Sequence, residues 1–378
     1  MREYILVMLA GAATTYLLSG LARAVAIKLG IEAQVRERDV HSRPTPYLGG
    51  VAMLAGVAVA FLLASIMPFL GRHEVVTRDS LGIFAAAALV CAVGVVDDAI
   101  ELPAVAKAAG QVLAAGIAVL NGVRMYWISL PDRIIALDQP TSIIITVVFI
   151  FICVNAINFV DGLDGLAAGV VAIGSAAMFT YTYVLAREQN FVVATTASLV
   201  TSTTTGVCLG FLPHNFHRAR MFMGDSGSML LGLLLACSSL SFTGQIDSRA
   251  LSESGTGVLP SWLPLVLPFA IMALPLFDLV AAYVRRTWNG KWWFVADKQH
   301  LHHRLLQRGH SVVGAVLVMY LWTAVIGFGV VLIGLLRSWW VVVAFVAAVV
   351  TLIVTTARVA PAPREPATPR VPADVADK

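Results

Sequence analysis

Charged side chains are scarce in this sequence. Asp, Glu, Lys and Arg make up 13% of the 378 residues, whereas they make up roughly a quarter of an ordinary soluble domain. Hydrophobic residues make up 58%, which is more than one soluble core can bury. We therefore expect an all-α, polytopic integral membrane protein. The basic residues form no continuous stripe, so the net charge of +4 favours membrane topology, and we expect no nucleic-acid partner.

Cysteine is scarce as well. Each of the four cysteines lies in an apolar run with no partner nearby in sequence: Cys91, Cys153, Cys208 and Cys237. This pattern argues against a disulfide framework or a zinc cluster, and it predicts reduced side chains that pack in the interior. The N-terminus also lacks a basic n-region and a small-residue cleavage site. We therefore interpret residues 4–25 as a retained spanning helix and not as a signal peptide.

Long apolar runs follow one another along most of the chain. A spanning helix needs about 20 mainly apolar residues, and on that criterion we expect about eleven spans. They run near residues 4–26, 48–70, 80–96, 103–120, 141–158, 163–186, 191–212, 226–244, 262–284, 312–336 and 338–357. Residues 1–357 are interpreted as one transmembrane domain. The segment 358–378 is rich in proline and poor in large apolar residues, so we expect a disordered cytoplasmic tail.

The distribution of Lys and Arg predicts the orientation of these spans. Alternate loops, starting at residue 28 and including the tail, hold seventeen basic residues, and the opposite set of loops holds eight. The positive-inside rule places the first set in the cytoplasm. The N-terminus is then outside the cell and the tail is inside.

The acidic and amide residues of the spans gather at the ends predicted to face the cytoplasm. They are Asp97, Asp98, Asn155, Asn158, Asp161, Asp164, Asn215 and Asp225. A carboxylate inside the membrane costs on the order of 2.5–3.5 kcal/mol on insertion scales. A divalent metal ion, together with nearby Lys and Arg, would offset that cost. Carboxylate and amide oxygens favour Mg²⁺, with Mn²⁺ as the alternative, and Mg²⁺ prefers few protein ligands together with substrate phosphates.

Each of these motifs also has a purely structural interpretation. Asp97 and Asp98 can cap the next helix, because Pro103 follows them. The segment 161–166, Asp-Gly-Leu-Asp-Gly-Leu, can form a tight turn whose glycines adopt positive φ, although two acids without a nearby Lys or Arg exceed what a turn requires. In segment 222–228, Asp225 or Ser226 can cap a helix whose N-terminus would equally bind an anion.

The histidine cluster His300, His302 and His303 lies in the largest loop predicted to be cytoplasmic. Its i, i+2, i+3 spacing does not place all three rings on one face of a helix, and no cysteine is near, which argues against structural zinc. Imidazoles that donate hydrogen bonds to phosphate, or that act as acid–base groups, fit the pattern better.

Taken in chain order, these motifs resemble those of the polyprenyl-phosphate N-acetylhexosamine-1-phosphate transferases, membrane enzymes that begin bacterial cell-envelope glycans. The resemblance runs from His41 to about Gly309 and so covers most of the chain. It rests on Lys107 with Gln111 and on the segments RPTPYLGG (43–50), GVVDD (94–98), NAINFVDGLDGLAAG (155–169), FMGDSGS (222–228) and HLHH (300–303). Because five motifs lie in order on one predicted membrane face, the match is specific.

Within this superfamily the chain is more similar to the branch that loads N-acetylglucosamine-1-phosphate than to the phospho-N-acetylmuramoyl-pentapeptide transferases of peptidoglycan synthesis. The latter have an uninterrupted His-His-His and a Thr-Gly-Ser after Gly-Asp, whereas here Leu301 interrupts the histidines and Ser226 takes the place of Thr. That second branch stays open as the alternative. A polytopic transporter and a metal-dependent membrane phosphatase are the rivals from other classes, but most of the acids lie at span ends and no internal repeat is visible.

The resemblance implies a reaction and a set of site residues. A polyprenyl phosphate attacks the sugar-bearing phosphorus of a UDP-N-acetylhexosamine, UMP leaves, and a polyprenyl-diphospho-sugar remains. The implied catalytic residues are Asp97, Asp98, Asp225, His302 and His303, and the implied Mg²⁺ ligands are Asp225 and Asn158. The residues implied to bind substrate are Lys107, Asn155, Asp161, Gly162, Leu163, Asp164, Asn215, Phe222 and His300.

The same resemblance implies where the enzyme works. Uridine would lie against segment 162–164 and Phe222, and the acids of segment 97–98 would face the lipid phosphate. The catalytic domain would be the transmembrane domain 1–357, in a bacterial inner membrane, with its active site facing the cytoplasm. A homodimer is considered beside a monomer.

Overall fold

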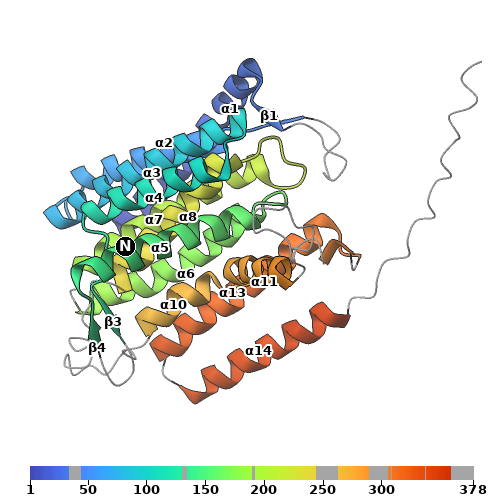
Figure 1. Cartoon of the computed structure of the whole chain (residues 1–378). Helices are drawn as coiled ribbons and strands as arrows, with labels where there is room; N and C mark the ends of the chain where they lie inside the picture. Colours follow the sequence, from blue (N-terminus) through green and yellow to red (C-terminus); the bar gives the residue numbers. More distant parts are fainter. Residues whose placement is uncertain are drawn as a thin grey trace, which may run out of the picture.

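The structure is a computed structural model, and it describes residues 1–33, 44–129, 134–189, 192–243, 263–288, 305–307, 309–336 and 338–358. The described elements are, in chain order, α1 (Arg2–Leu29), β1 (Glu32–Ala33), β2 (Thr45–Pro46), α2 (Gly49–Ile66), α3 (Glu74–Ile100), α4 (Ala104–Leu120), β3 (Trp127–Ser129), β4 (Ile134–Ala136), α5 (Gln139–Val160), α6 (Leu166–Gln189), α7 (Val192–Asn215), α8 (Gly224–Thr243), α10 (Leu263–Ile271), α11 (Ala273–Trp288), α13 (Val312–Leu336) and α14 (Trp339–Arg358). The helices form one bundle (Figure 1), and the strands form two short antiparallel hairpins, β1–β2 and β3–β4.

The predicted all-α, polytopic class is confirmed. Eight described helices are long and apolar enough to cross a membrane, namely α1, α2, α3, α5, α6, α8, α13 and α14. Each predicted span overlaps at least one described helix, but α4 has only 17 residues. The count of about eleven spans therefore stays a prediction. Of the predicted tail, only Arg358 lies within the described residues, at the end of α14.

The predicted span 262–284 is divided in the structure. A turn at Met272 separates α10 from α11. Pro275 lies in the first turn of α11 and has no N–H to bond to the carbonyl of Ile271, so a continuous helix would lose a hydrogen bond there. The sequence pattern of apolar residues runs through this break without marking it.

Helix α7 carries many hydroxyl groups and yet lies inside the bundle. Several of its buried threonines, though not Thr196 and Thr203, bond to carbonyls of their own helix. For example, Thr201 Oγ1 donates to Ala197 O at 2.7 Å, and Thr204 Oγ1 donates to Val200 O at 2.7 Å. Hydroxyls satisfied in this way can be buried at low cost. This arrangement explains why a segment of modest hydropathy packs between α1, α6 and α8.

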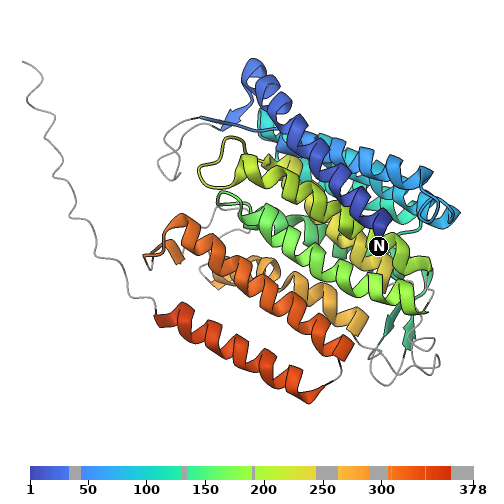
Figure 2. The same cartoon turned by 180° about the vertical axis from the view of Figure 1, so that it is seen from behind.

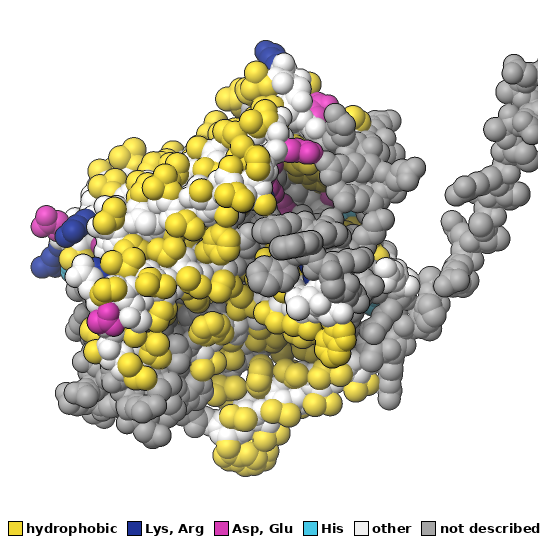
Figure 3. Space-filling view, viewed as in Figure 1, with side chains coloured by type: hydrophobic (Ala, Val, Ile, Leu, Met, Phe, Trp, Pro, Cys, Tyr) yellow, Lys and Arg dark blue, Asp and Glu magenta, His cyan; other side chains and the backbone are white. Residues whose placement is uncertain are grey.

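The bundle is organised around α8. In its most apolar stretch, 94% of the residues are buried, and α2, α3, α5 and α7 surround it. The last helix, α14, is the opposite case, with 6% of the residues buried, and it lies at the edge of the bundle in both views (Figures 1 and 2). Apolar side chains cover a wide area of the described surface (Figure 3), as expected for a surface that meets lipid. All four cysteines are free and buried, as predicted.

One end of the bundle brings together the ends of several helices. Figure 1 shows β1 at this end and the β3–β4 hairpin at the opposite end. The segment from the end of β2 to the start of α2 bonds to the segment that precedes α8: Phe222 N donates to Pro46 O at 3.0 Å, and Gly49 N donates to Phe222 O at 3.2 Å. The start of α8 is thereby fixed beside the start of α2. We refer to this end, where α3 and α5 finish and α4 and α8 begin, as the site end.

Candidate active site

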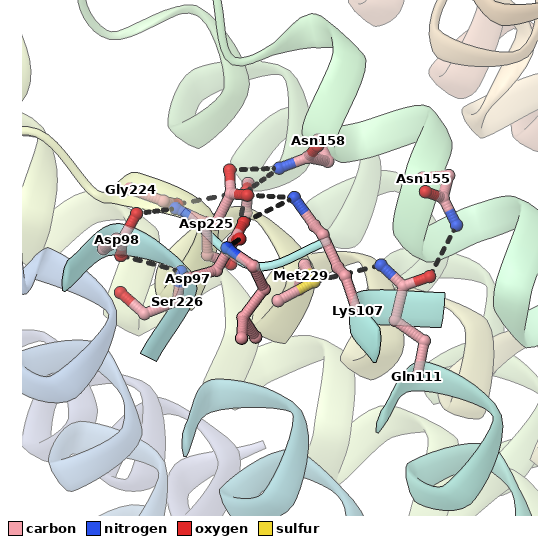
Figure 4. A network of polar contacts seen from close by, with 12 residues as sticks. Asp97, Asp98, Lys107, Gln111, Asn155, Asn158, Gly224, Asp225, Ser226 and Met229 are labelled. Atoms are coloured by element: carbon pink, nitrogen blue, oxygen red, sulfur yellow. Dashed lines mark hydrogen bonds and ion pairs between the residues drawn. The ribbon is translucent and has the colours of Figure 1, made fainter. Parts of the chain in front are cut away.

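Three charged side chains from three helices meet at the site end (Figure 4). Asp97 lies in the last turn of α3, Lys107 in the first turn of α4, and Asp225 in the first turn of α8. The Lys107 ammonium lies 3.0 Å from Asp97 Oδ2 and forms a second ion pair with Asp225 Oδ2. Lys107 and Asp225 are 118 positions apart in the chain. The fold therefore brings two acids from distant helices together on one ammonium group.

An amide from α5 completes the contacts of Asp225. Asn158 Nδ2 donates to Asp225 Oδ1 at 2.7 Å and to Ser228 Oγ at 2.8 Å. Ser228 follows Asp225 by three residues and so lies on the same face of α8. Side chains thus hold both oxygens of the Asp225 carboxylate, and we call Asp97, Lys107, Asn158 and Asp225 the carboxylate–lysine cluster.

Asp98 adjoins Asp97 in sequence but binds a different group. Its Oδ1 accepts a hydrogen bond from the backbone N–H of Asp225 at 2.8 Å, and its Oδ2 accepts one from the N–H of Ser226 at 3.2 Å. Asp97 Oδ1 accepts from the N–H of Leu102 at 2.7 Å, in the α3–α4 connection. From the sequence, the structural interpretation of Asp97 and Asp98 was that they cap the helix after Pro103. In the structure Asp98 does cap a helix, but that helix is α8 and not α4.

A second set of amides extends the network along α4 and α5. Gln111 lies one turn after Lys107, and its Nε2 donates to Met229 Sδ at 3.0 Å. Asn155 Nδ2 donates to Gln111 Oε1 at 2.8 Å and to the carbonyl of Phe151 at 2.8 Å. In Figure 4 the bonds of Gln111 lead to Asn155 and Met229, so these two amides lie beside the carboxylate–lysine cluster without a drawn bond to it.

The turn between α5 and α6 is held by the backbone contacts of two buried side chains. Asp164 Oδ2 accepts from the N–H of Ala219 at 3.0 Å. Asn215 Oδ1 accepts from the N–H of Gly165 at 3.0 Å, and Asn215 Nδ2 donates to the carbonyl of Met221 at 3.0 Å. Asp164 and Asn215, which we call the turn pair, thereby join the α5–α6 turn to the loop before α8.

Tyr320 of α13 also takes part in this turn, because its hydroxyl donates to the carbonyl of Gly165. Gly165 has a φ of 74°, as the turn interpretation predicted for a glycine, whereas Gly162 is not among the described residues with positive φ. Gly162 is exposed and Leu163 is buried. The backbone of the turn is therefore exposed at Gly162, whereas residues 163–165 are buried or bonded to neighbouring segments.

Asp161 lies in this turn, next to the carboxylate–lysine cluster. Burial raises the pKa of the Asp161 carboxyl well above its usual value, and the negative charges of Asp225, Asp98 and Asp164 raise this pKa further. Negative charge at the site end therefore exceeds what Lys107 neutralises. An added cation would relieve this repulsion.

Phe222 lies in the loop that leads to α8. Its ring centroid is 6.0 Å from that of Tyr47, and its backbone bonds to residues 46 and 49. The predicted uridine contacts at Phe222 and at segment 162–164 thus lie on two loops that the turn pair joins. The histidines at 300, 302 and 303 lie outside the described residues.

The sequence interpretation missed three contributors. Ser228 and Gln111 stood within the quoted motifs but were not assigned to the site, although their positions at i+3 from Asp225 and i+4 from Lys107 place them on the same helix faces. Tyr320 lies outside every motif, in a long apolar run, and no local signal marks it.

The donor set of the cluster fits a hard divalent cation. Carboxylate oxygens of Asp225 and Asp97 and the amide oxygen of Asn158 are the ligand types that Mg²⁺ prefers. Among the described residues, no group of three or more His, Cys, Asp or Glu side chains is placed to hold a metal ion. In proteins Mg²⁺ takes few protein ligands and fills the remaining positions with water and substrate phosphates.

Comparison with known proteins agrees with this geometry. The sequence model of glycosyl transferase family 4 matches residues 80–243. The chain is 44% identical over 333 residues to the decaprenyl-phosphate N-acetylglucosaminephosphotransferase of Mycolicibacterium smegmatis, across 87% of this chain and 82% of that protein. It is 33% identical over 309 residues to the probable undecaprenyl-phosphate N-acetylglucosaminyl 1-phosphate transferase of Bacillus subtilis, across 82% and 78%.

The other branch of the superfamily is a more distant match. The phospho-N-acetylmuramoyl-pentapeptide-transferase of Mycobacterium tuberculosis is 30% identical over 270 residues, across 62% of this chain and 75% of that protein. The matched residues 80–243 contain every residue of the carboxylate–lysine cluster. The chain therefore belongs to glycosyl transferase family 4, together with these polyprenyl-phosphate N-acetylglucosaminephosphotransferases.

Proposed function

We propose that this chain transfers N-acetylglucosamine-1-phosphate from UDP-N-acetylglucosamine to a polyprenyl phosphate and releases UMP. The observation that carries the proposal is the carboxylate–lysine cluster, in which Lys107 lies between Asp97 and Asp225. Relatives at 44% and 33% identity are named for this transfer. The apolar exterior of the bundle gives a lipid acceptor access to the site end from the bilayer.

The reaction requires two anions to approach each other, so charge neutralisation and alignment are the main tasks of the protein. The ammonium of Lys107 is held by two carboxylates at once, which keeps it extended toward the space between α3 and α8. An incoming phosphate replaces one of these carboxylates as its partner. Lys107 then orients the lipid phosphate toward the phosphorus that bears the sugar.

Asp97 is assigned an orienting role in this scheme. The second pKa of a phosphate monoester is about 6, so a lipid phosphate is already mostly dianionic near neutral pH and has little need of a general base. Asp97 is bonded to the N–H of Leu102 and paired with Lys107, which fixes both the α3–α4 connection and the ammonium. Its carboxylate thus places the cation against which the nucleophile aligns.

We propose Mg²⁺ as the cofactor, with Asp225 and Asn158 as its protein ligands. The excess of carboxylates around Lys107 and their hard oxygen donors support this assignment. When bound, the metal would neutralise the diphosphate and stabilise UMP as it leaves. Asn158 Nδ2 lies 2.7 Å from Asp225 Oδ1, so the two side chains are already adjacent, and the Asn158 amide has to turn its oxygen toward the ion to form the ligand pair.

We also propose that the site end faces the cytoplasm of a bacterial inner membrane. The count of seventeen basic residues against eight in alternate loops supports this orientation. Lys28, Arg218 and Arg220 all lie in segments at the site end. A homodimer stays a prediction, which light scattering of the purified protein in detergent would test.

The test is exchange of labelled UMP into UDP-N-acetylglucosamine by the purified protein. We expect exchange only when polyprenyl phosphate and Mg²⁺ are both present, because the reverse transfer needs the lipid-linked product. Absence of exchange would exclude the proposed transfer and leave the transporter or phosphatase interpretation. Exchange into UDP-N-acetylmuramoyl-pentapeptide in place of UDP-N-acetylglucosamine would assign the chain to the muramoyl-pentapeptide branch.

A further inference from the structure

The N-terminus of α8 is bonded by a side chain from another helix. The first amides of an α-helix have no partner within the helix, and they attract anions. In α8 these groups include the N–H of Asp225 and the N–H of Ser226, and the two oxygens of Asp98 accept one each, at 2.8 Å and 3.2 Å. Asp98 lies on α3, 127 positions before Asp225. One carboxylate therefore satisfies two free donors of the helix that carries Asp225.

The surrounding backbone is built for this close contact. Gly224 has a φ of 68°, and a Cβ atom added to it would collide with the carboxylate of Asp98. Gly94 lies one turn before Asp98 on α3, and a Cβ atom there would collide with the backbone of Ser226. Two glycines, one on each side, thus allow α3 and the start of α8 to touch. Neither helix can shift along the other without breaking these contacts.

This contact has two consequences for Asp225. The positive end of α8, which the sequence alone offered as a site for a substrate anion, is occupied by a carboxylate of the protein. The backbone of Asp225 is fixed from α3 by Asp98, while its side chain is held from α4 and α5 by Lys107 and Asn158. The direction of the Asp225 carboxylate depends on all three contacts.

We propose that Asp98 is a positioning residue: it binds the first amides of α8 and so aims the carboxylate of Asp225, and it contacts neither the lipid phosphate nor the diphosphate. Its kinetic consequences rest on the proposed function, whereas the amide bonds themselves can be tested without it. Asp97 and Asp98, adjacent in sequence, then serve different groups, since Asp97 places Lys107 and Asp98 places Asp225.

Hydrogen exchange tests the amide bonds directly. In the full-length protein without substrate, Asp98→Asn should speed exchange of the backbone amides in a peptide spanning residues 221–230 by about tenfold, since one acceptor and the negative charge are lost. Asp97→Asn is the matched control, and it should leave amide exchange in this peptide unchanged, because Asp97 contacts the side chain of Asp225 and accepts its backbone hydrogen bond from Leu102. Unchanged exchange in Asp98→Asn would overturn the proposal.

Steady-state kinetics separate positioning from substrate contact. In Asp98→Asn, kcat should fall by about 100-fold, as for a misplacement of about 1 Å, while KM for both substrates stays within about twofold. A large rise in KM for the lipid phosphate with little change in kcat would show direct contact and contradict the proposal. If the unaltered protein transfers no sugar phosphate, the proposed function fails, but the exchange result still decides the role of Asp98.

Gly224→Ala provides a second variant in which Asp98 is unchanged. The added methyl group would push the carboxylate of Asp98 away from the amides of α8. The same increase in amide exchange and the same loss of kcat at constant KM are expected. Wild-type exchange and kcat in this variant would contradict the proposal.

Discussion

The two polar clusters at the site end use their side chains in different ways. Around Asp225 the side chains bind one another, with Lys107 on one oxygen and Asn158 on the other. Around Asp164 and Asn215 they bind the backbone at residues 165, 219 and 221, and the His217 ring is a longer side-chain contact, 3.7 Å from Asp164 Oδ2. Partners of the first kind can be exchanged for a phosphate or a metal ion without disturbing the main chain. Partners of the second kind define the shape of the loops and cannot be released without disordering them.

This difference separates the acids that can take part in catalysis from the acids that stabilise the loops. Asp98 lies beside the carboxylate–lysine cluster, yet by its contacts it resembles the turn pair, since each of its two oxygens accepts a hydrogen bond from a backbone N–H group. Proximity to a candidate site is therefore a poor guide to the role of a carboxylate. The identity of its partner is the better guide, and the predictions below test that rule.

The largest effect is expected for Asp225→Asn. The substitution removes the charge of the proposed metal ligand, so UMP exchange should fall by about 1000-fold, the upper range for loss of one electrostatic group in an active site. The thermal unfolding midpoint should stay unchanged, because Lys107 retains Asp97 and the backbone bonds remain. Exchange assays and thermal unfolding in detergent would check both parts.

Asp79→Asn is the matched control for that variant. Asp79 is a buried acid of the same bundle, on α3 and 18 residues before Asp97, which is about 27 Å along the helix. It should retain UMP exchange. Near-normal Mg²⁺-dependent UMP exchange in Asp225→Asn would show that the carboxylate–lysine cluster is no more catalytic than the turn pair.

The next effect is expected for Lys107→Gln. Loss of the ammonium leaves Asp97 and Asp225 without their shared cation and removes the group proposed to orient the lipid phosphate, so kcat/KM for that substrate should fall by about 100-fold. Lys28→Gln, at the exposed end of α1, is the control and should change little. Equal kinetics in the two variants would show that Lys107 has a structural role only.

A smaller effect on activity, but a clear effect on stability, is expected for Asp164→Ala. The N–H of Ala219 loses its acceptor, which costs about 1–3 kcal/mol, and the unfolding midpoint without substrate should fall. Asp161→Asn is the control: it keeps the size of the side chain and removes a charge that burial and the neighbouring carboxylates disfavour, so it should not lower the unfolding midpoint. Unchanged stability with a large rise in KM for UDP-N-acetylglucosamine would place Asp164 in the uridine pocket instead.

The smallest effect is expected for Tyr320→Phe. It removes one hydrogen bond to the carbonyl of Gly165 and should lower the free energy of unfolding by about 1 kcal/mol, with little change in kcat. Tyr126→Phe, at an exposed position near the opposite end, should have no effect. A loss as large as that of Asp164→Ala would show that α13, and not the turn pair, holds the α5–α6 turn.

Much of the fold could be predicted from the sequence because spanning helices need long apolar runs. The segments around α1, α5 and α13 are of this kind. The break between α10 and α11 was missed because hydropathy does not register the missing N–H of Pro275. The buried position of α8 could not be predicted either, because an apolar sequence is compatible with a helix surrounded by lipid and with a helix surrounded by protein.

The convergence of acids was predicted, but their partners were not. Asp97 and Asp98 are the same residue type at adjacent positions, and only the rotation of about 100° between them sends one to Lys107 and the other to the start of α8. Which partner each acid contacts depends on how closely α3 and α8 approach each other at Gly94, and this distance is set by helix packing. The contact of Tyr320 with the turn is likewise set by the placement of α13 alone.

Binding of UDP-N-acetylglucosamine to the purified protein tests the central claim most directly, because no acceptor lipid or turnover is required. Calorimetric titrations would compare Mg²⁺ with EDTA, in the unaltered protein and in Asp225→Asn. We expect binding to weaken by about tenfold or more on removal of Mg²⁺, which is the loss of one strong electrostatic contact, and we expect Asp225→Asn to bind at that weaker level with or without Mg²⁺. Equal affinity in all four titrations would contradict the claim that these helix ends hold a metal-bound diphosphate.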